Sequence, residues 1–201
     1  MKLTFNNDVV GLAAETPEEQ AICAYLMVAD AHVFQLHCTT DRGFAFTELG
    51  PEADACRAPL NITRSVEPQF QPISNLARTP FELDGERYAS VEGFWQGLKF
   101  VEPEQRRQLA KLFGPEAKGR GAAAGQSTTI DYAGQSIPTG SPEHWQLMRS
   151  ACEAKFTQHK PARAALVATG QRWLTHKVRH DSRTIPGVVM AQIWMDLRAS
   201  L

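Results

Sequence analysis

The stretch that constrains the fold most is SVEGFWQGLKF, residues 90–100, which reads as an amphipathic helix with Ser90 as its N-cap. One stripe of this helix is apolar, as is typical of a helix packed on a core. The stripe consists of Val91, Phe94, Trp95 and Leu98. Gly93 and Gly97 interrupt the helix, although each glycine costs roughly 1 kcal/mol relative to alanine. Glycines at these positions would let another backbone or a ligand come close.

A ridge of polar side chains lies beside the apolar stripe. Glu92, Gln96 and Lys99 have the spacing i, i+4 and i+7, which places them on one face of the helix. One interpretation is a solvated surface, on which Glu92 and Lys99 are two turns apart and form no good direct pair. The other is a helix that presents a carboxylate, an amide and an ammonium group to one bound molecule. Periodicity alone does not decide between them.

From Phe70 onward the chain is predicted to be mostly helical. The run PFELDGERYAS reads as two short strands around the Asp84-Gly85 turn, and the run QRWLTHKV reads as a strand. The helix signals are serine caps, initial prolines and terminal glycines. They predict helices over residues 103–113, 142–158 with Ser141 as cap, 161–168 and 187–199.

The first 65 residues have a different pattern and read as a small unit of their own. The run Thr16-Pro17-Glu18-Glu19 has an N-cap, a helix-starting proline and an acid, which predicts a helix over residues 17–29. The β-rich runs HVFQLHC and GFAFTEL, separated by TTDR, predict a hairpin. We therefore expect an α+β, mainly α-helical protein with short strands. Residues 1–65 would be an N-terminal α/β extension, whose role the sequence does not indicate, and residues 66–201 the main domain.

Composition narrows the class of protein. The 201 residues are 43% hydrophobic, which is enough for one well-packed core. With 21 basic and 22 acidic residues the net charge is -1, so strong general binding to nucleic acid or to an anionic membrane is not expected. The chain has neither a long apolar run nor the order of a signal peptide, which predicts a cytoplasmic protein.

Metal chemistry is not predicted. The four cysteines are scattered singly without a C-x-x-C, which favours free thiols over a zinc site or a disulfide framework. His176 and His180 are four residues apart, but no third ligand is near them in the sequence. We expect no metal or redox cofactor.

The segment ISNLARTPFELDGERYASVEGFWQGLKF, residues 73–100, resembles the opening motif of the NADAR (YbiA-like) family. In that motif a serine-asparagine pair is followed by a "pF.ldG..y.SvEh..Q..Kf" pattern. The resemblance continues through EAKGRG, through a tryptophan and "M...C.AKF" in residues 145–156, through LVATGQRWL, Asp181 and IWMDLR. It covers about residues 70 to 200 and does not include the first 65.

The resemblance implies an N-glycosidase fold that handles ribosyl or ADP-ribosyl compounds. Family activities are hydrolysis of the N-glycosidic bond in phosphorylated riboflavin-pathway intermediates and removal of ADP-ribose from modified guanine bases. Breaking such a C1′–N bond builds positive charge on the ribose and negative charge on the leaving base. A carboxylate near C1′ stabilises the former and can orient or deprotonate a water molecule.

The motif residues therefore have expected roles. Glu92 matches the motif glutamate and would be the carboxylate at C1′. Lys99 matches the motif lysine and would hold a phosphate, stabilise the leaving base, or attack C1′ of the opened sugar if its pKa is lowered. Gln96 would bind ribose hydroxyls. Asp181 matches a late family acid and is a second candidate for a catalytic or ligand contact, with a solvated loop acid as the alternative.

Five further residues are candidates for substrate binding. Ser74 and Asn75 match the serine-asparagine pair, although a turn asparagine bonded to its own backbone would look the same. Trp145 matches a family tryptophan and would either stack on the base or belong to the core. Lys118 and Arg120 would bind a substrate phosphate.

The chain departs from the family pattern at several positions. Gly93 stands where the motif usually has histidine, which would remove a ligand contact or widen the pocket. Thr175 and His176 stand where the family tends to have an acid, and SRTIPG replaces a tryptophan-glycine pair after Asp181. The glycine-rich run GRGAAAGQS, residues 119–127, lacks the residues of a phosphate loop and is expected to be a flexible, partly exposed loop and a candidate lid.

We thus expect an N-glycosidase that hydrolyses the C1′–N bond of an ADP-ribosylated or phosphoribosylated base. The substrate would be a small nucleotide or an ADP-ribosylated nucleic-acid base, with no membrane partner; the sequence does not specify an oligomeric state. The alternative from another class is a module that binds ADP-ribose or a related nucleotide without cleaving it. A third reading is an interaction protein whose specificity lies in the first 65 residues.

Overall fold

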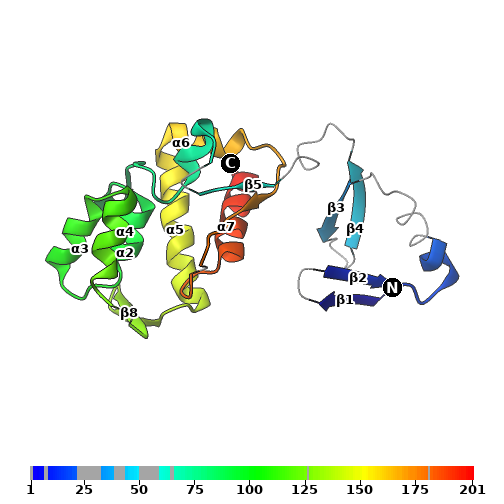
Figure 1. Cartoon of the computed structure of the whole chain (residues 1–201), viewed down its shortest axis with the longest axis horizontal. Coiled ribbons are helices and arrows are strands. Elements are labelled where there is room, and N and C mark those ends of the chain that lie inside the picture. The colour runs from blue at the N-terminus through cyan, green and yellow to red at the C-terminus, as the bar shows by residue number, and fades with distance from the viewer. Residues whose placement is uncertain are drawn as a thin grey trace. The chain divides into compact units, whose positions relative to one another are not determined.

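The computed structural model describes residues 2–6, 9–21, 33–38, 44–49, 59–63, 66–125, 127–180 and 182–201 (Figure 1). The chain divides into two compact units, Met1–Cys56 and Arg57–Leu201.

The first unit contains two antiparallel hairpins. Strand β3 (Val33–Cys38) pairs with β4 (Phe44–Leu49), which confirms the predicted hairpin. Strand β1 (Lys2–Asn6) pairs with β2 (Val9–Ala13), and the sequence reading missed this hairpin.

The predicted start of the helix in this unit is confirmed by its cap. The backbone N–H of Glu19 donates to Oγ1 of Thr16 over 3.3 Å, and the Glu19 carboxylate accepts from the N–H of Thr16 over 3.3 Å. This reciprocal pairing is a capping box. The backbone is helical from Pro17 to Ala21, while the rest of the predicted helix and the TTDR segment lie outside the described residues.

The second unit is mainly helical with short strands, as the sequence predicted. Its helices are η2 (Pro68–Ile73, a 3-10 helix), α2 (Val91–Gly97), α3 (Pro103–Ala110), α4 (Gly114–Ala122), α5 (Pro142–Gln158), α6 (Lys160–Val167) and α7 (Gly187–Ser200). Its strands are β5 (Leu60–Asn61), β6 (Phe81–Leu83), β7 (Glu86–Tyr88), β8 (Thr129–Tyr132), β9 (Gln135–Pro138) and β10 (Leu174–Thr175). Ser90 and Ser141 cap α2 and α5, accepting from the N–H of Gly93 and of His144.

The strands of this unit form three separate pairs. β6 and β7 pair around Asp84 and Gly85, whose positive φ angles of 51° and 79° suit the predicted turn. β8 and β9 form a hairpin that was not predicted. β5 and β10 pair in parallel, with Leu60 opposite Leu174. This last pair ties the beginning of the unit to a segment more than one hundred residues later.

The prediction of a flexible loop over residues 119–127 is wrong for its first part, because α4 extends through Ala122. The helix forms despite its glycines because Gly121 lies directly against Gln96 of α2. A Cβ atom added at Gly121 would stand 2.0 Å from Oε1 of Gln96. Close packing of two helices thus outweighs the poor helix propensity of glycine here.

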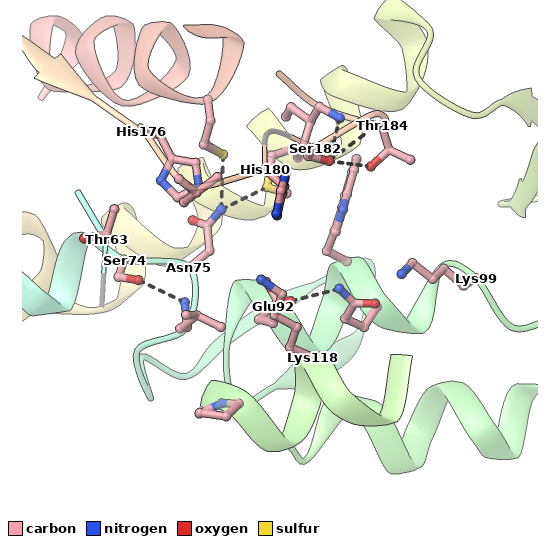
Figure 2. Close-up of a pocket in the computed structure, with 18 residues that line it drawn as sticks. Thr63, Ser74, Asn75, Glu92, Lys99, Lys118, His176, His180, Ser182 and Thr184 are labelled. Carbon is pink, nitrogen blue, oxygen red and sulfur yellow. Dashed lines mark hydrogen bonds between the residues drawn. The ribbon is translucent and has the colours of Figure 1, made fainter. Parts of the chain in front are cut away.

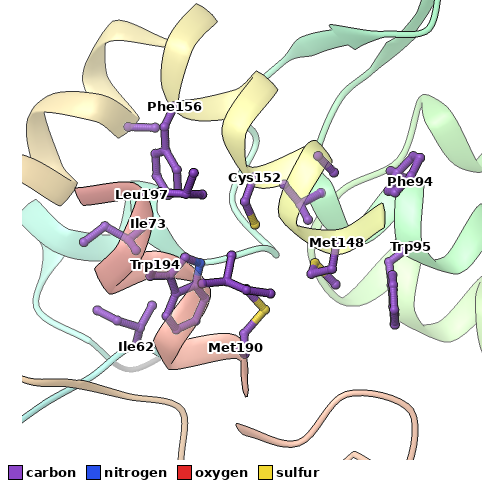
Figure 3. Close-up of a cluster of buried hydrophobic side chains, with 14 of the residues drawn as sticks. Ile62, Ile73, Phe94, Trp95, Met148, Cys152, Phe156, Met190, Trp194 and Leu197 are labelled. Atoms are coloured by element: carbon purple, nitrogen blue, oxygen red, sulfur yellow. The ribbon is translucent and has the colours of Figure 1, made fainter. Parts of the chain in front are cut away.

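Helix α5 is the centre of the second unit. It contacts α2 on one side and α7 on the other, and Figure 1 shows it between them. The core contains large apolar side chains from these helices together with Ile62 and Ile73 from the segments before them (Figure 3). Leu60 and Ile62 are 3% and 0% exposed, so the residues just before position 65 belong to this core.

Candidate functional site

A cavity of about 620 Å³ lies between the beginning of α2, α4 and the segment that joins β10 to α7. Its polar lining residues are Thr63, Ser74, Asn75, Glu92, Gln96, Lys99, Lys118, His176, His180, Ser182 and Thr184. Apolar lining residues include Trp95, Met148, Ile185 and Met190. Figure 2 shows Glu92 and Lys118 on one side of this space and the histidines on the opposite side.

Glu92 lies in the first turn of α2, and its position is set by two hydrogen bonds. Its backbone N–H donates to the carbonyl of Asn75 over 2.9 Å, and its Oε1 accepts from Nε2 of Gln96 over 2.8 Å. Burial raises the pKa of the Glu92 carboxyl, and this outweighs the opposing effects of Gln96 and the nearby cations. A carboxylate with a raised pKa is a better proton acceptor at neutral pH than an exposed one.

Gln96 holds Glu92 in place through its amide nitrogen. Its Oε1 is directed at Gly121, is buried, and has no hydrogen-bond partner among the described residues. The amide donor expected for ribose hydroxyls is thus bonded to the Glu92 carboxylate.

Two lysines line the same cavity. Burial lowers the pKa of Lys99, and Lys118 acts in the same direction, while Glu92 opposes both. A lowered pKa is what the nucleophilic role of Lys99 requires. Lys118 is carried by α4, so the extension of that helix sets where this ammonium group can reach.

Asn75 uses its side chain inside the protein and not for its own backbone. Its Nδ2 donates to the sulfur of Met190 over 3.1 Å and to that of Met148 over 3.6 Å. Its Oδ1 accepts from Sγ of Cys152 over 3.8 Å. These contacts argue against the reading of Asn75 as a simple turn residue.

A fully buried lysine supports the segment that carries Ser74 and Asn75. Nζ of Lys155 donates to the carbonyls of Ile73 over 2.8 Å and of Ser74 over 2.9 Å. Burial lowers the pKa of Lys155 to about 7. Because the Asn75 carbonyl in turn accepts from Glu92, this lysine supports one wall of the cavity from behind.

Two of the predicted site residues, Trp145 and Arg120, do not line the cavity. Nε1 of Trp145 donates to the carbonyl of Thr184 over 2.8 Å, and its ring packs against the core, as the alternative reading expected. Arg120 is exposed beside a surface groove with Lys111 and Glu116. Asp181 lies outside the described residues, although His180 and Ser182 on either side of it line the cavity.

The two glycines of α2 have different surroundings, and the atoms nearest to both belong to the protein. A Cβ atom at Gly93 would stand 2.6 Å and 2.7 Å from the carbonyl oxygens of Leu109 and Leu112. Gly93 therefore faces the end of α3 and does not widen the cavity, so the hypothesis of a wider pocket is wrong. At Gly97 the nearest atoms would be at ordinary contact distances of 3.8 Å or more.

The sequence reading missed several lining residues. Trp95 belongs to the core, as predicted, but it also lines the cavity, and its ring stacks on that of His144 with centroids 4.1 Å apart. Its position three residues after Glu92 was the available signal, since residues i and i+3 are neighbours on a helix. The positions of His176, His180 and Thr184 in the cavity could not be predicted from their spacing, because these residues lie in an irregular segment.

Among the described residues, the cavity lining combines one carboxylate with two ammonium groups and two imidazole rings. No cluster of three metal-binding side chains occurs among the described residues. Within the same part of the chain, no helix is long and apolar enough to cross a membrane.

The fold and the site thus define an α+β domain with a half-buried glutamate and two lysines around one cavity. The family model described as bacteriophage protein GP30.3 matches residues 70–195. The chain belongs to this family, which confirms the YbiA-like NADAR resemblance.

Several individual proteins are similar to this chain. N-glycosidase YbiA of Escherichia coli (strain K12) is 27% identical over 118 residues, which cover 59% of this chain and 69% of that protein. An uncharacterized 17.1 kDa protein from the Gp30-rIII intergenic region of Enterobacteria phage T4 is 34% identical over 109 residues, covering 53% and 72%. The NMR structure of E. coli YbiA matches with a TM-score of 0.48 and 23% identity, covering 71% of this chain and 92% of that one.

Proposed function

We propose that this protein is an N-glycosidase that hydrolyses the C1′–N bond of a phosphoribosylated or ADP-ribosylated base. The observation that carries the proposal is the half-buried carboxylate of Glu92, the one acid among the described lining residues, in a cavity that also holds Lys99 and Lys118. Relatives that are named N-glycosidase support the class of reaction.

Glu92 would act at the sugar carbon. Cleavage of the C1′–N bond leaves positive charge on the ribose ring, which a carboxylate stabilises most strongly in a site that excludes water. The same carboxylate would accept a proton from the water that attacks C1′, since its raised pKa suits general-base catalysis. Gln96 would keep Oε1 of Glu92 in position while this happens.

The lysines would bind the anionic part of the substrate. A phosphate or pyrophosphate group accepts charge-assisted hydrogen bonds from ammonium groups, and Lys99 and Lys118 line the cavity with Glu92. Lys99 is also a candidate for attack on C1′ of the opened sugar, since burial lowers its pKa.

The test is a chromatographic assay of the wild type and the Glu92→Gln variant. Each is incubated with an ADP-ribosylated guanine oligonucleotide and with a phosphorylated ribosylaminopyrimidine, and released base or ADP-ribose is measured. We expect release by the wild type and a loss of at least about 100-fold in the variant, since one general base contributes that much or more. Equal turnover by both proteins would remove Glu92 from the mechanism.

The rival function, binding of ADP-ribose without cleavage, predicts a different pair of results. Titration calorimetry would detect binding, and neither substrate would release a product. Gly93 no longer favours this rival, because it faces α3 and not the cavity.

A further inference from the structure

His176 lines the cavity, and two contacts with other parts of the protein fix the position of its ring. It directly follows β10, and Figure 2 shows it on the wall opposite Glu92. The pairing of β5 with β10 brings it against the beginning of the unit, where the N–H of Ile62 donates to the carbonyl of Thr175 over 2.8 Å. Its ring meets the ring of Trp194 edge-on, with centroids 5.5 Å apart.

One hydrogen bond determines which ring nitrogen of His176 is protonated and acts as the donor. Nδ1 of His176 lies 2.7 Å from the carbonyl oxygen of Ile62. A carbonyl oxygen can only accept, so Nδ1 must be the donor. Nε2 is therefore the nitrogen left for a ligand, and no described residue is hydrogen-bonded to it.

A hydrolytic N-glycosidase needs a second proton carrier besides Glu92. The base departs with the electron pair of the C1′–N bond, and a neutral base leaves readily only if a proton reaches it. The other titratable groups among the described lining residues are Glu92, Lys99, Lys118 and His180. In the route in which water attacks C1′, Glu92 acts on the water and both lysines bind the phosphate; Lys99 would attack C1′ only in the other route. His180 is exposed, and no ring nitrogen of it is bonded to a described residue.

We infer that His176 is the proton donor to the leaving base, an inference that rests on the proposed function. The C1′–N bond breaks and its electron pair stays on the base nitrogen, which takes the proton from Nε2 of His176. Water adds to C1′ and gives its proton to Glu92. Return of that proton from Glu92 to His176 restores both groups, so that one water is consumed per bond cleaved.

The hydrogen bond through Nδ1 fixes the His176 ring on this wall of the cavity, so that its Nε2 is the nitrogen left for a ligand.

The test distinguishes loss of the proton donor from a change in the structure of the cavity wall. His176→Asn keeps an amide N–H close to the position of Nδ1, so the bond to Ile62 can form, but it lacks Nε2. His176→Gln is the matched opposite, since its amide reaches the position of Nε2 and not that of Nδ1. The substrate is the glycoside that the wild type cleaves in the assay above, prepared with a neutral base and with the same base alkylated on a ring nitrogen.

An alkylated, cationic base leaves without needing a proton. We therefore expect His176→Asn to lose roughly 100-fold or more in kcat on the neutral substrate and to change less than about 3-fold on the cationic one. His176→Gln should show the same loss of kcat on the neutral substrate, because an amide group does not transfer a proton to the leaving base. Thermal melting of both variants checks the fold.

Other outcomes would overturn the inference. Equal losses on both substrates would show that His176 only shapes the wall. Unchanged kcat on the neutral substrate would show that another group supplies the proton. Failure of the wild type to cleave either glycoside would instead overturn the proposed function itself, and the role of His176 with it.

Discussion

At the scale of single residues, the site depends on polar groups that folding has removed from water. Glu92 is stabilised in its cavity by one amide, and Lys155 is stabilised in the core by two carbonyl groups. Each of these charged groups loses hydration that its partners only partly replace, so burial shifts the protonation equilibrium of each toward its neutral form. The pKa of Glu92 is therefore raised and that of Lys155 is lowered.

The buried Lys155 should make stability depend on pH. Its pKa is about 7 in the folded protein, against an ordinary value of 10.5. Between these values the unfolded chain binds more protons, so the free energy of unfolding should rise with pH. We expect a rise of roughly 1–2 kcal/mol from pH 7 to pH 9, measured by urea denaturation. Above pH 9 the raised pKa of Cys152, about 12, works against this trend, because the unfolded thiol ionises first.

The variant Lys155→Met should lack this rise, since it has no proton to lose. It should also be less stable than the wild type at pH 9, because two buried carbonyls lose their donor. The exposed Lys111→Met is the control and should keep the wild-type slope. A parallel pH dependence in wild type and Lys155→Met would contradict the assignment.

At the scale of elements, the close approach of α2 to its neighbours explains the glycines that the sequence displays. Gly93 allows contact with the end of α3, and Gly121 of α4 allows contact with Gln96 of α2. The helix α2 thus packs against both α3 and α4. Its polar residues Glu92, Gln96 and Lys99 line the cavity. The sequence predicted that another backbone or a ligand would come close, and the approaching groups belong to the protein itself.

The two glycines of α2 should respond differently to alanine. At Gly93 the new Cβ atom would overlap two backbone carbonyls, so Gly93→Ala should destabilise the protein by about 1–3 kcal/mol. At Gly97 the new Cβ atom would make only ordinary contacts of 3.8 Å or more, so Gly97→Ala should be neutral or slightly stabilising, by up to about 1 kcal/mol. Chemical denaturation of both variants provides the comparison. Equal effects at both positions would show that helix propensity alone decides.

At the scale of the whole molecule, the compact unit that carries the site begins near Arg57. Leu60 and Ile62 are buried in its core, and β5 pairs with β10 beside the cavity. The carbonyl of Ile62 also accepts from the ring of His176. Residues that the sequence reading placed in the N-terminal extension are therefore part of the packing that supports one wall of the site.

Two fragments should differ in stability. In the full chain, the second unit should have its own unfolding transition. A fragment of residues 57–201 should melt at the temperature of that transition. A fragment of residues 66–201 should be less stable by at least about 4 kcal/mol, because loss of one buried Leu or Ile side chain alone costs about 2–5 kcal/mol. Calorimetric melting of the two fragments and the full chain would show the difference. Coincident melting of both fragments would mean that β5 contributes nothing to the core.

The sequence by itself determined the local structure and one face of the site. Serine caps, initial prolines and the Asp84-Gly85 turn act over a few residues, so the starts of α2 and α5 and the hairpin of β6 and β7 could be predicted. The spacing of Glu92, Gln96 and Lys99 placed them on one helix face for the same reason.

Tertiary structure alone decided what stands opposite that face. Trp145 and Arg120 lie away from the cavity, while Trp95 and His176 line it, because the packing of α4, α5 and the β5–β10 pair selects which side chains meet. Such contacts join segments that are far apart in the chain, and no local periodicity records them. The proton position on His176, for example, depends on a carbonyl that belongs to Ile62, more than one hundred residues earlier.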